Sequence, residues 1–148
     1  MKYFIRQTKH KDLPAILELV KEFHAETLNE FGVFCNEEVA QELMPKLIDT
    51  SLVLIVDDKL VGVIAGFITN HIVSKEPLFQ EVMWYVSKEH RRYGIRLYLE
   101  LEKWCKGKSI KQMVMVNMGG IKDNIFKKFY ESQGYRLLET QYIKNLED

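Results

Sequence analysis

The chain has 148 residues, of which 47% are hydrophobic and 28% are charged, a length and composition that suit a single domain with one core over residues 1–148. Lysine plus arginine equals aspartate plus glutamate at 21 each, and this zero formal net charge argues against a general nucleic-acid binder, which would carry a basic excess. Neither a signal-peptide pattern nor a run of about 18 apolar residues occurs, and the two cysteines show no C-x-x-C spacing, so we expect a cytoplasmic protein without membrane span, metal site or disulfide framework.

The first half of the chain alternates β-forming runs with helical patterns. Residues 3–8 are short and rich in β-formers, which predicts a strand. Asp12 is predicted to cap a helix whose apolar stripe extends to Phe23, followed by a loop that ends at Asn36, the predicted cap of a second helix. Two apolar runs then flank Asp57-Asp58-Lys59, which predicts a β-hairpin.

The second half continues in the same alternating way. It predicts a strand over residues 79–87, a helix from about Gly94 to Cys105 and a strand over 111–118, then a break at Gly119-Gly120. A short helix over 123–133 is predicted to end at Gly134, and residues 135–146 read as strand material with a bend near 138. The order β-α-α-β-β-β-α-β-α-β-β predicts an α/β or α+β sheet covered by helices on both faces.

The stretch "EHRRYGIRLYLELEKW", residues 89–104, places two arginines before a helix whose N-terminus is already positive. A strand, a tight turn and a helix N-terminus together form an anion cradle, in which Gly94 lets a phosphate approach the backbone. Arg91 and Arg92 would add charge-assisted hydrogen bonds. On this stretch alone, a helix N-terminus with solvated arginines is an equally good interpretation.

These residues resemble a known family. "RRYGIR" is similar to the pyrophosphate-binding signature (Q/R)-x-x-G-x-(G/A) of the GNAT superfamily of N-acetyltransferases, except that Arg96 stands at the last position. "KKFYESQGY" resembles the family's late motif Y-x-x-x-G-(F/Y), with Tyr130 and Gly134 in register. The first strand and helix and the hairpin also resemble the family, and "GIRLY", "EKW" and "GYRLLETQYIKNL" resemble a phage- and prophage-associated branch of it.

The resemblance implies a single GNAT-like domain whose mixed, mostly antiparallel sheet is splayed between the fourth and fifth strands. It implies transfer of an acetyl group from acetyl-coenzyme A (acetyl-CoA) to a primary amine, by direct attack in a ternary complex. The residues that it implies for cofactor binding lie on the strand before the turn, in the turn and on the late helix. They are Trp84, Tyr85, Val86, Arg91, Arg92, Tyr93, Gly94, Ile95, Arg96, Asn124 and Lys127.

The resemblance implies Tyr130 as the acid that protonates the departing thiolate, although an aromatic residue beside Phe126 and Phe129 also suits a core. Glu81 stands where some members place a general base. Strand alternation puts Glu81 on the face opposite Val82, Trp84 and Val86 and favours a solvated carboxylate. In the loop that the resemblance assigns to the acceptor pocket lie His24, Glu26 and Glu30, each of which taken singly also suits an ordinary surface position.

The sequence is also compatible with other functions. A non-catalytic coenzyme A-binding or interaction module with the same fold is one, and Arg96 in the cradle favours it slightly while Tyr130 disfavours it. An acetyltransferase toxin acting on charged tRNA is another, disfavoured by the zero net charge. The acceptor could be a small amine, an antibiotic, a peptide N-terminus, a lysine or an aminoacyl group, and a homodimer is compatible with the sequence.

Overall fold

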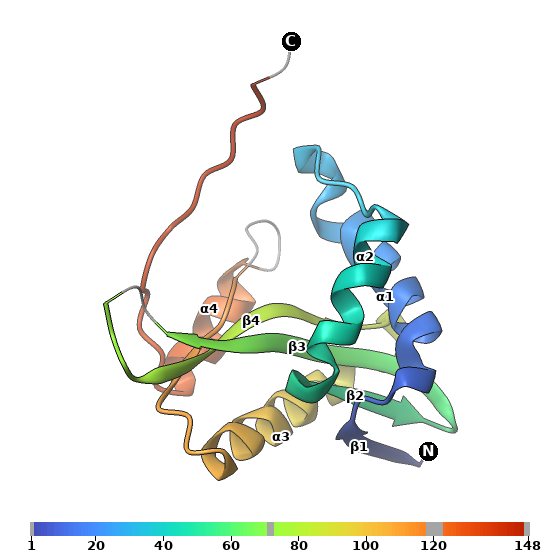
Figure 1. The fold of residues 1–148 in the computed structure, drawn as a ribbon, viewed down its shortest axis with the longest axis horizontal. Coiled ribbons are helices and arrows are strands. Elements are labelled where there is room, and N and C mark those ends of the chain that lie inside the picture. The colour runs from blue at the N-terminus through green and yellow to red at the C-terminus, as the bar shows by residue number, and fades with distance from the viewer. Residues whose placement is uncertain (1, 71–72, 118–122, 147–148) are drawn as a thin grey trace.

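The computed structural model describes residues 2–70, 73–117 and 123–146, which build one five-stranded sheet (Figure 1). Neighbouring strands follow chain order, the first four pair antiparallel, and the fourth and fifth pair parallel. The strands are β1 (Tyr3–Gln7), β2 (Ser51–Val56), β3 (Lys59–Asn70), β4 (Pro77–Val86) and β5 (Gln112–Val114). The mixed, mostly antiparallel sheet expected from the sequence is therefore confirmed.

Helices cover both faces of this sheet, also as expected. The α-helices are α1 (Leu13–Thr27), α2 (Glu37–Leu43), α3 (Gly94–Gly107) and α4 (Asp123–Ser132), and the 3-10 turns are η1 (His10–Asp12), η2 (Asn29–Phe31), η3 (Met44–Thr50) and η4 (Lys88–Tyr93). One core cluster joins α3 and α4 to the sheet, and a second joins α1 to the opposite face (Figure 1). Among the described residues, no helix is long and apolar enough to cross a membrane.

Several local predictions are confirmed because short-range chemistry determines them. Asp57 and Asp58 both have positive φ angles, 48° and 65°, as a two-residue hairpin turn of the primed type requires. The Asn36 side chain accepts a hydrogen bond from the Val39 N–H and caps α2. Gly134 ends α4 with φ of 90°, a left-handed conformation that favours glycine.

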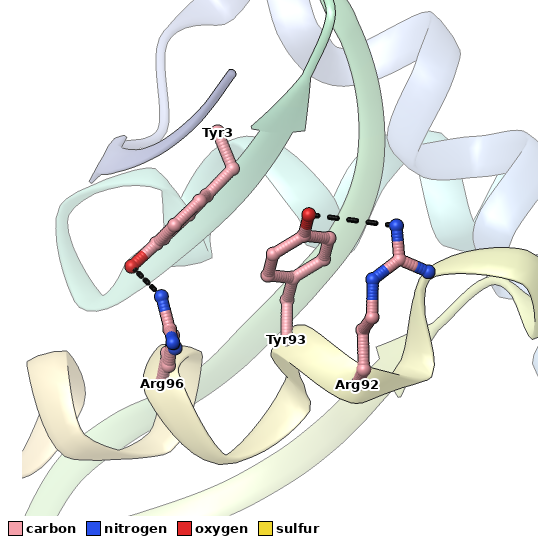
Figure 2. A pocket seen from close by; sticks show the side chains of 4 residues that line it. All are labelled: Tyr3, Arg92, Tyr93 and Arg96. Atoms are coloured by element: carbon pink, nitrogen blue, oxygen red, sulfur yellow. Dashed lines mark hydrogen bonds between the residues drawn. The ribbon is translucent and has the colours of Figure 1, made fainter. Parts of the chain in front are cut away.

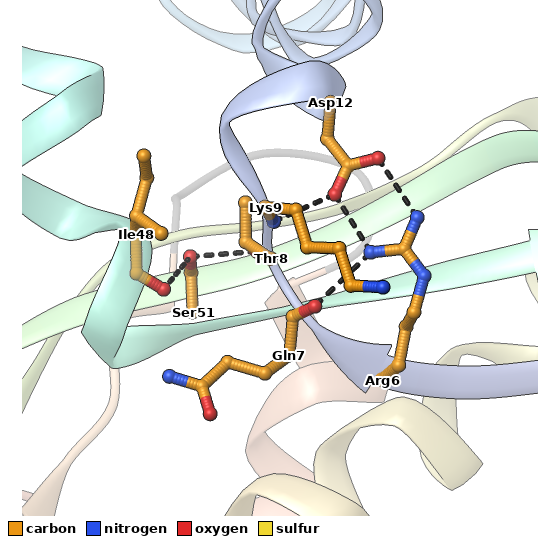
Figure 3. A network of polar contacts seen from close by, with 7 residues as sticks. All are labelled: Arg6, Gln7, Thr8, Lys9, Asp12, Ile48 and Ser51. Carbon is orange, nitrogen blue, oxygen red and sulfur yellow. Dashed lines mark hydrogen bonds and ion pairs between the residues drawn. The ribbon is translucent and has the colours of Figure 1, made fainter.

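Asp12 occupies the N-cap position of α1, as predicted, but its side chain forms no capping hydrogen bond with the helix. The turn η1 precedes the helix, and the Asp12 carboxylate instead forms two hydrogen bonds with the Arg6 guanidinium, at 2.7 and 2.8 Å (Figure 3). It also accepts the Lys9 backbone N–H at 2.8 Å. The Arg6 hydrogen bonds hold the pKa of Asp12 below its usual value in spite of burial. This bidentate pair ties β1 to the start of α1.

The sheet opens between β4 and β5. The two strands pair only from Leu78 with Gln112 to Gln80 with Val114, while β4 continues to Val86. The splay expected between the fourth and fifth strands is thus present. It leaves one edge of the second half of β4 without a partner strand among the described residues, beside the face that α3 and α4 cover.

A β-bulge changes which side chains of β4 face this opening. Ala65 of β3 pairs with Met83 and Gly66 pairs with Glu81, so Val82 has no partner in the register. One extra residue reverses the alternation. Phe79 and Val86 therefore belong to the same core cluster, against which Trp84 also packs. Simple alternation would put Phe79 on the face opposite Trp84 and Val86. The prediction that Glu81 lies opposite Trp84 and Val86 is wrong for this reason.

Residues 135–146 form no strand, so the expected strand material at this end is wrong. The segment leaves α4 and runs away from the sheet (Figure 1), and Leu137, Tyr142 and Leu146 are 87%, 93% and 86% exposed. β-forming residues stabilise a strand only when a neighbouring strand pairs with them. The predicted break at Gly119-Gly120 lies outside the described residues.

Candidate active site

Glu81 is buried at the opening between β4 and β5 and is only 7% exposed, so the expectation of a solvated carboxylate is wrong. Burial raises the pKa of Glu81 to about 8, and a hydrogen bond from the Val116 backbone partly opposes that rise. Val116 lies just beyond β5, where the two strands have parted. A carboxyl group that exchanges its proton near neutral pH is suited to acid–base chemistry.

Tyr130, on α4, also contacts Val116. Its hydroxyl donates a hydrogen bond to the Val116 carbonyl at 2.9 Å, and the side chain is 8% exposed. Burial raises the pKa of Tyr130, and the charges of Glu81 and Tyr135 raise it further. The phenol therefore stays protonated across the physiological range. Val116 thus contacts both groups: its N–H faces the Glu81 carboxyl group, and its carbonyl accepts the Tyr130 hydroxyl.

An aromatic cluster holds Tyr130 in place. The Trp84 ring lies 5.8 Å from both Phe126 and Phe129 and 6.3 Å from Tyr130, measured between ring centroids. Tyr130 is therefore part of the core, as the alternative interpretation held, and its hydroxyl is nevertheless directed to the opening. The Trp84 indole is packed beneath α3 and α4 in the same way, so Trp84 offers a ligand its backbone rather than its ring.

Tyr85 and Val86 lie at the end of β4, beyond the point at which β4 and β5 part. The Tyr85 hydroxyl lies on the α1 side, where its single proton is shared between Glu26 Oε1 at 2.8 Å and Glu22 Oε2 at 3.2 Å. Val86 is buried, and its carbonyl accepts a hydrogen bond from Arg91 Nε at 3.1 Å. Glu22 was not predicted from the sequence, although its position four residues before Glu26 puts both on one face of α1.

The structure brings Glu26, predicted on the acceptor side, together with Arg91, predicted on the cofactor side. Their ion pair measures 2.6 Å, and the Arg91 guanidinium also lies 5.6 Å from the centroid of the Tyr85 ring. Burial raises the pKa of Glu26, but the hydrogen bonds from Tyr85 and Arg91 outweigh burial and the net shift is downward. A phosphate contact by the Arg91 guanidinium would therefore compete with Glu26.

The other two residues predicted on the acceptor side lie at the end of α1 and just after it. His24 Nδ1 lies 3.3 Å from the Val33 carbonyl, so this ring links α1 to the loop before α2. Glu30 lies on η2 and is exposed. On α4, Asn124 and Lys127 are exposed as well, and neither contacts the turn before α3 in a hydrogen bond or ion pair.

Gly94 begins α3 in ordinary helical conformation, with φ of −59° and ψ of −41°, so its backbone does not require glycine. A Cβ atom placed there would meet only Val86 Cγ2, at 3.9 Å, so packing within the chain does not require glycine either. The open space suits a ligand that approaches the backbone closely. Among the described residues, no side chain caps α3. The Gly94 N–H already donates to the Arg91 carbonyl, because η4 leads directly into the helix.

The other residues of the turn face outward. Ile95 is 52% exposed, and Arg92, Tyr93 and Arg96 line a pocket of about 430 Å³ with Tyr3 of β1 (Figure 2). Arg96 donates a hydrogen bond to the Tyr3 hydroxyl and lies over the Tyr3 ring. The arginine at the last signature position is therefore directed to β1.

The comparisons with known proteins come from one family model and from solved structures. Residues 13–135 match the model of the "Acetyltransferase (GNAT) family". No curated protein sequence matches the chain significantly.

Solved structures resemble the chain over almost its whole length. A ribosomal-protein-alanine N-acetyltransferase from Brucella melitensis biovar Abortus 2308 is 20% identical, with a TM-score of 0.75, over 99% of this chain and 100% of that one. The aminoglycoside N-acetyltransferase AAC(6′)-Iy, in complex with the bisubstrate analogue CoA-S-monomethyl-acetylneamine, is 14% identical, with a TM-score of 0.74, over 100% of both chains. An aminoglycoside acetyltransferase, HMB0005, from an uncultured soil metagenomic sample is 15% identical, with a TM-score of 0.72, over 99% of this chain and 100% of that one. At these identities the likeness concerns the fold.

Proposed function

Because the chain belongs to the GNAT acetyltransferase family, we propose that it transfers an acetyl group from acetyl-CoA directly to a primary amine, with Glu81 and Tyr130 as its proton-transfer residues. The observation that carries this assignment is their shared contact with Val116. A buried carboxyl group with a pKa of about 8 and a buried phenol meet one residue, where β4 and β5 part.

The turn before α3 fits the pyrophosphate of the coenzyme. The fold has room for a Cβ atom at Gly94, and because glycine has none, that space is open to a phosphate. The N-terminus of α3, which begins at Gly94, favours an anion there. Bound there, acetyl-CoA would supply the acetyl group as a thioester with a good leaving group. The chain would hold the phosphates at Gly94 and direct the rest of the molecule along the unpaired edge of β4.

Glu81 would take the proton from the acceptor. An alkylammonium with pKa near 10.4 is neutral in only about one molecule in 10³ at pH 7, so a base is needed once the amine is bound. The Glu81 carboxylate would accept the proton directly or through one water, and the nitrogen would then form its bond to the acetyl carbon. With a pKa of about 8, the ionised fraction of Glu81 increases through the neutral range.

Tyr130 would act at the other end of the reaction. As the bond between the acetyl carbon and sulfur breaks, the electron pair remains on sulfur and the Tyr130 hydroxyl would donate a proton to it. In the structure the hydroxyl donates this proton to the Val116 carbonyl, and the raised pKa keeps the phenol protonated but makes it a weaker donor to the thiolate. A thiol with pKa near 8.5 leaves readily, so this acid supplies a moderate part of the rate.

The acceptor is proposed to be cationic in solution and to approach from the side of α1. Glu22 and Glu26 face Tyr85 there, and His24 positions the following loop. Of the three similar structures described above, two are aminoglycoside acetyltransferases and one is a ribosomal-protein-alanine N-acetyltransferase, which supports both a small polyamine and a peptide amine. We propose an amine of one of these two classes.

We also propose that residues 1–148 act as one domain in the cytoplasm, either as a monomer or as a homodimer. The family match over residues 13–135 supports a single domain. The stretches "GIRLY" and "GYRLLETQYIKNL" support placement in the phage-associated branch. The zero net charge supports an acceptor other than nucleic acid.

The function is tested by release of coenzyme A from acetyl-CoA across a panel of aminoglycosides, polyamines and peptides, with mass spectrometry of each product. We expect a mass increase of one acetyl group on one class of amine. Acetyl-CoA should also raise the melting temperature, because a ligand that binds only the folded state stabilises it. A melting temperature that rises with no acetylation of any amine would favour the non-catalytic module, and no rise would argue against both.

Tyr130→Phe should lower turnover by about tenfold to a hundredfold, the low end for a general acid, because thiolate leaves readily. The ring stays, so the packing against Trp84 is conserved and affinity for acetyl-CoA should not change. Steady-state kinetics of both proteins would measure this effect, with Tyr142→Phe on the exposed terminal segment as the control. Equal kcat for wild type and Tyr130→Phe would leave Tyr130 with a packing role alone.

A further inference from the structure

Two arginines flank the start of α3, where positive charge is unfavourable: Arg92 lies on η4 and Arg96 in the first turn of α3. Arg92 and Arg96 are four residues apart, and like charges at that spacing repel each other. The N-terminus of a helix adds to the penalty, because its dipole is already positive there. Among the described residues, no carboxylate forms an ion pair with Arg96. Such an arrangement is stabilised by an anion.

The same arginines are held against aromatic rings. The rings of Tyr3 and Tyr93 lie 4.8 Å apart with an interplanar angle of 31°. The Arg92 guanidinium lies 4.7 Å from the centroid of the Tyr93 ring, and that of Arg96 lies 5.0 Å from the centroid of the Tyr3 ring. The Arg92 guanidinium donates hydrogen bonds to the Glu89 carbonyl at 2.9 Å and to the Tyr93 hydroxyl at 3.5 Å, and Arg96 donates one to the Tyr3 hydroxyl, so both guanidinium planes are fixed beside the rings. A guanidinium has five N–H donors, so Arg96 keeps further donors for a phosphate.

A pocket of about 430 Å³ lies between these four side chains (Figure 2). It is large enough for part of a nucleotide, with two aromatic rings to contact a base and two guanidinium groups to bind a phosphate monoester. Tyr3 lies on β1, outside the residues 13–135 that match the family model, so the match assigns it no role.

We propose that Tyr3, Arg92, Tyr93 and Arg96 bind the 3′-phosphate on the adenosine of the coenzyme. This proposal rests on the proposed function. Its chemistry, a phosphate monoester on a nucleoside, could also come from a free nucleotide. The position of the pocket favours the coenzyme, because Tyr93 directly precedes Gly94 and Arg96 follows it by two residues. A coenzyme whose pyrophosphate meets Gly94 has its adenosine next to this turn.

The rival location for the same phosphate is the exposed face of α4, where Lys127 and Lys128 lie. Neither lysine lines the pocket that contains Tyr3, Arg92, Tyr93 and Arg96. Replacement of Arg96 or Tyr3 should weaken binding of the phosphate if it lies in the pocket, and should not do so if it lies on α4.

The experiment compares binding of coenzyme A and of dephospho-coenzyme A, which lacks only the 3′-phosphate, by calorimetry at fixed ionic strength. Wild type should prefer coenzyme A by roughly tenfold to a hundredfold, the range for one or two charged hydrogen bonds. Arg96→Gln should lose most of that preference by binding coenzyme A more weakly, while its affinity for dephospho-coenzyme A stays the same. Tyr3→Phe, which removes the hydroxyl that holds Arg96 and keeps the ring, should lose part of it.

Lys103→Gln provides the matched control. It removes one exposed positive charge from the same helix and should keep the full preference, apart from a small general change. Adenosine 3′,5′-bisphosphate should compete with coenzyme A in wild type and bind more weakly to Arg96→Gln.

Three results would overturn the proposal. Wild type could bind both coenzymes equally, or Arg96→Gln could keep the full preference while Lys127→Gln loses it. The bisphosphate could also bind to the pocket without displacing coenzyme A, which would assign the site to a separate nucleotide. All three require that coenzyme A binds, whereas a failure of the proposed function would appear as no binding of either coenzyme.

Discussion

Glu81→Gln is expected to abolish most of the activity and, at the same time, to make the protein more stable near pH 8. The amide cannot accept the proton of the acceptor, and general-base catalysis contributes about 10²–10⁴-fold to the rate. The rate of wild type should increase with pH through about 8, as Glu81 ionises, and this limb should be absent from the variant. Initial rates from pH 6 to pH 9 would show both effects.

The gain in stability follows from the pKa of the buried group. Burial raises the pKa of Glu81 from near 4.3 in an unfolded chain to about 8, so its favourable contribution is complete below about pH 4 and is lost as the pH rises to about 8. The difference of about 4 units corresponds to at most about 5 kcal/mol. Glutamine has no charge to bury, so the variant should melt at a higher temperature than wild type at pH 8 and at a similar temperature at pH 4.

Glu131→Gln is the control for this experiment, because it removes an exposed carboxylate from α4 and should change neither the rate profile nor the melting temperature much. Two results would contradict the assignment. Activity of Glu81→Gln within a few-fold of wild type would exclude Glu81 as the base. A melting temperature that falls in the variant at pH 8 would mean that the carboxylate is better solvated than its burial indicates.

Gly94→Val is expected to abolish binding of acetyl-CoA and to leave the fold intact. A Cβ atom at position 94 would meet only Val86 Cγ2 at 3.9 Å, and the helical φ and ψ suit any residue. The branched side chain would fill the space in which a phosphate must meet the backbone. Calorimetry should detect no binding, while circular dichroism and the melting temperature should stay close to those of wild type.

Two alanine variants distinguish an effect on stability from an effect on binding of acetyl-CoA. Gly94→Ala should be more stable than wild type by about 0.4–1 kcal/mol, because alanine restricts the unfolded chain, and should bind acetyl-CoA more weakly. Gly107→Ala, at the other end of the same helix, has open space around its Cβ atom and should gain stability without losing affinity. If Gly94→Val folds and binds as wild type does, the phosphates lie elsewhere.

The sequence predicted those parts of the fold that neighbouring residues determine. The hairpin turn at Asp57 and Asp58, the cap at Asn36 and the end of α4 at Gly134 each depend on the backbone chemistry of a few adjacent residues. The apolar stripes on α1 and α3 likewise predicted two helices with one buried side each, and the two pack on opposite faces of the sheet. Periodicity and turn residues carry enough information for such features.

The features that the sequence did not predict depend on contacts between distant residues. The ion pair of Arg91 with Glu26 joins residues 65 positions apart, and nothing in either local pattern indicates it. Residues 135–146 have strand-forming side chains, but no strand of the described residues pairs with them. The face on which Glu81 lies was wrong because alternation assumes an uninterrupted register, and the register of β4 against β3 shifts by one residue.

The unpaired residue at position 82 determines which changes of length the proposed site tolerates. Loss of the single codon for Val82 would remove the bulge and leave Glu81 two positions before Trp84 and four before Val86. Plain alternation would then keep all three side chains on the same face of the sheet, beside Val116 and Tyr130. In a set of related genes, a one-residue gap at this position is therefore compatible with an intact site, whereas a substitution of Glu81 is not.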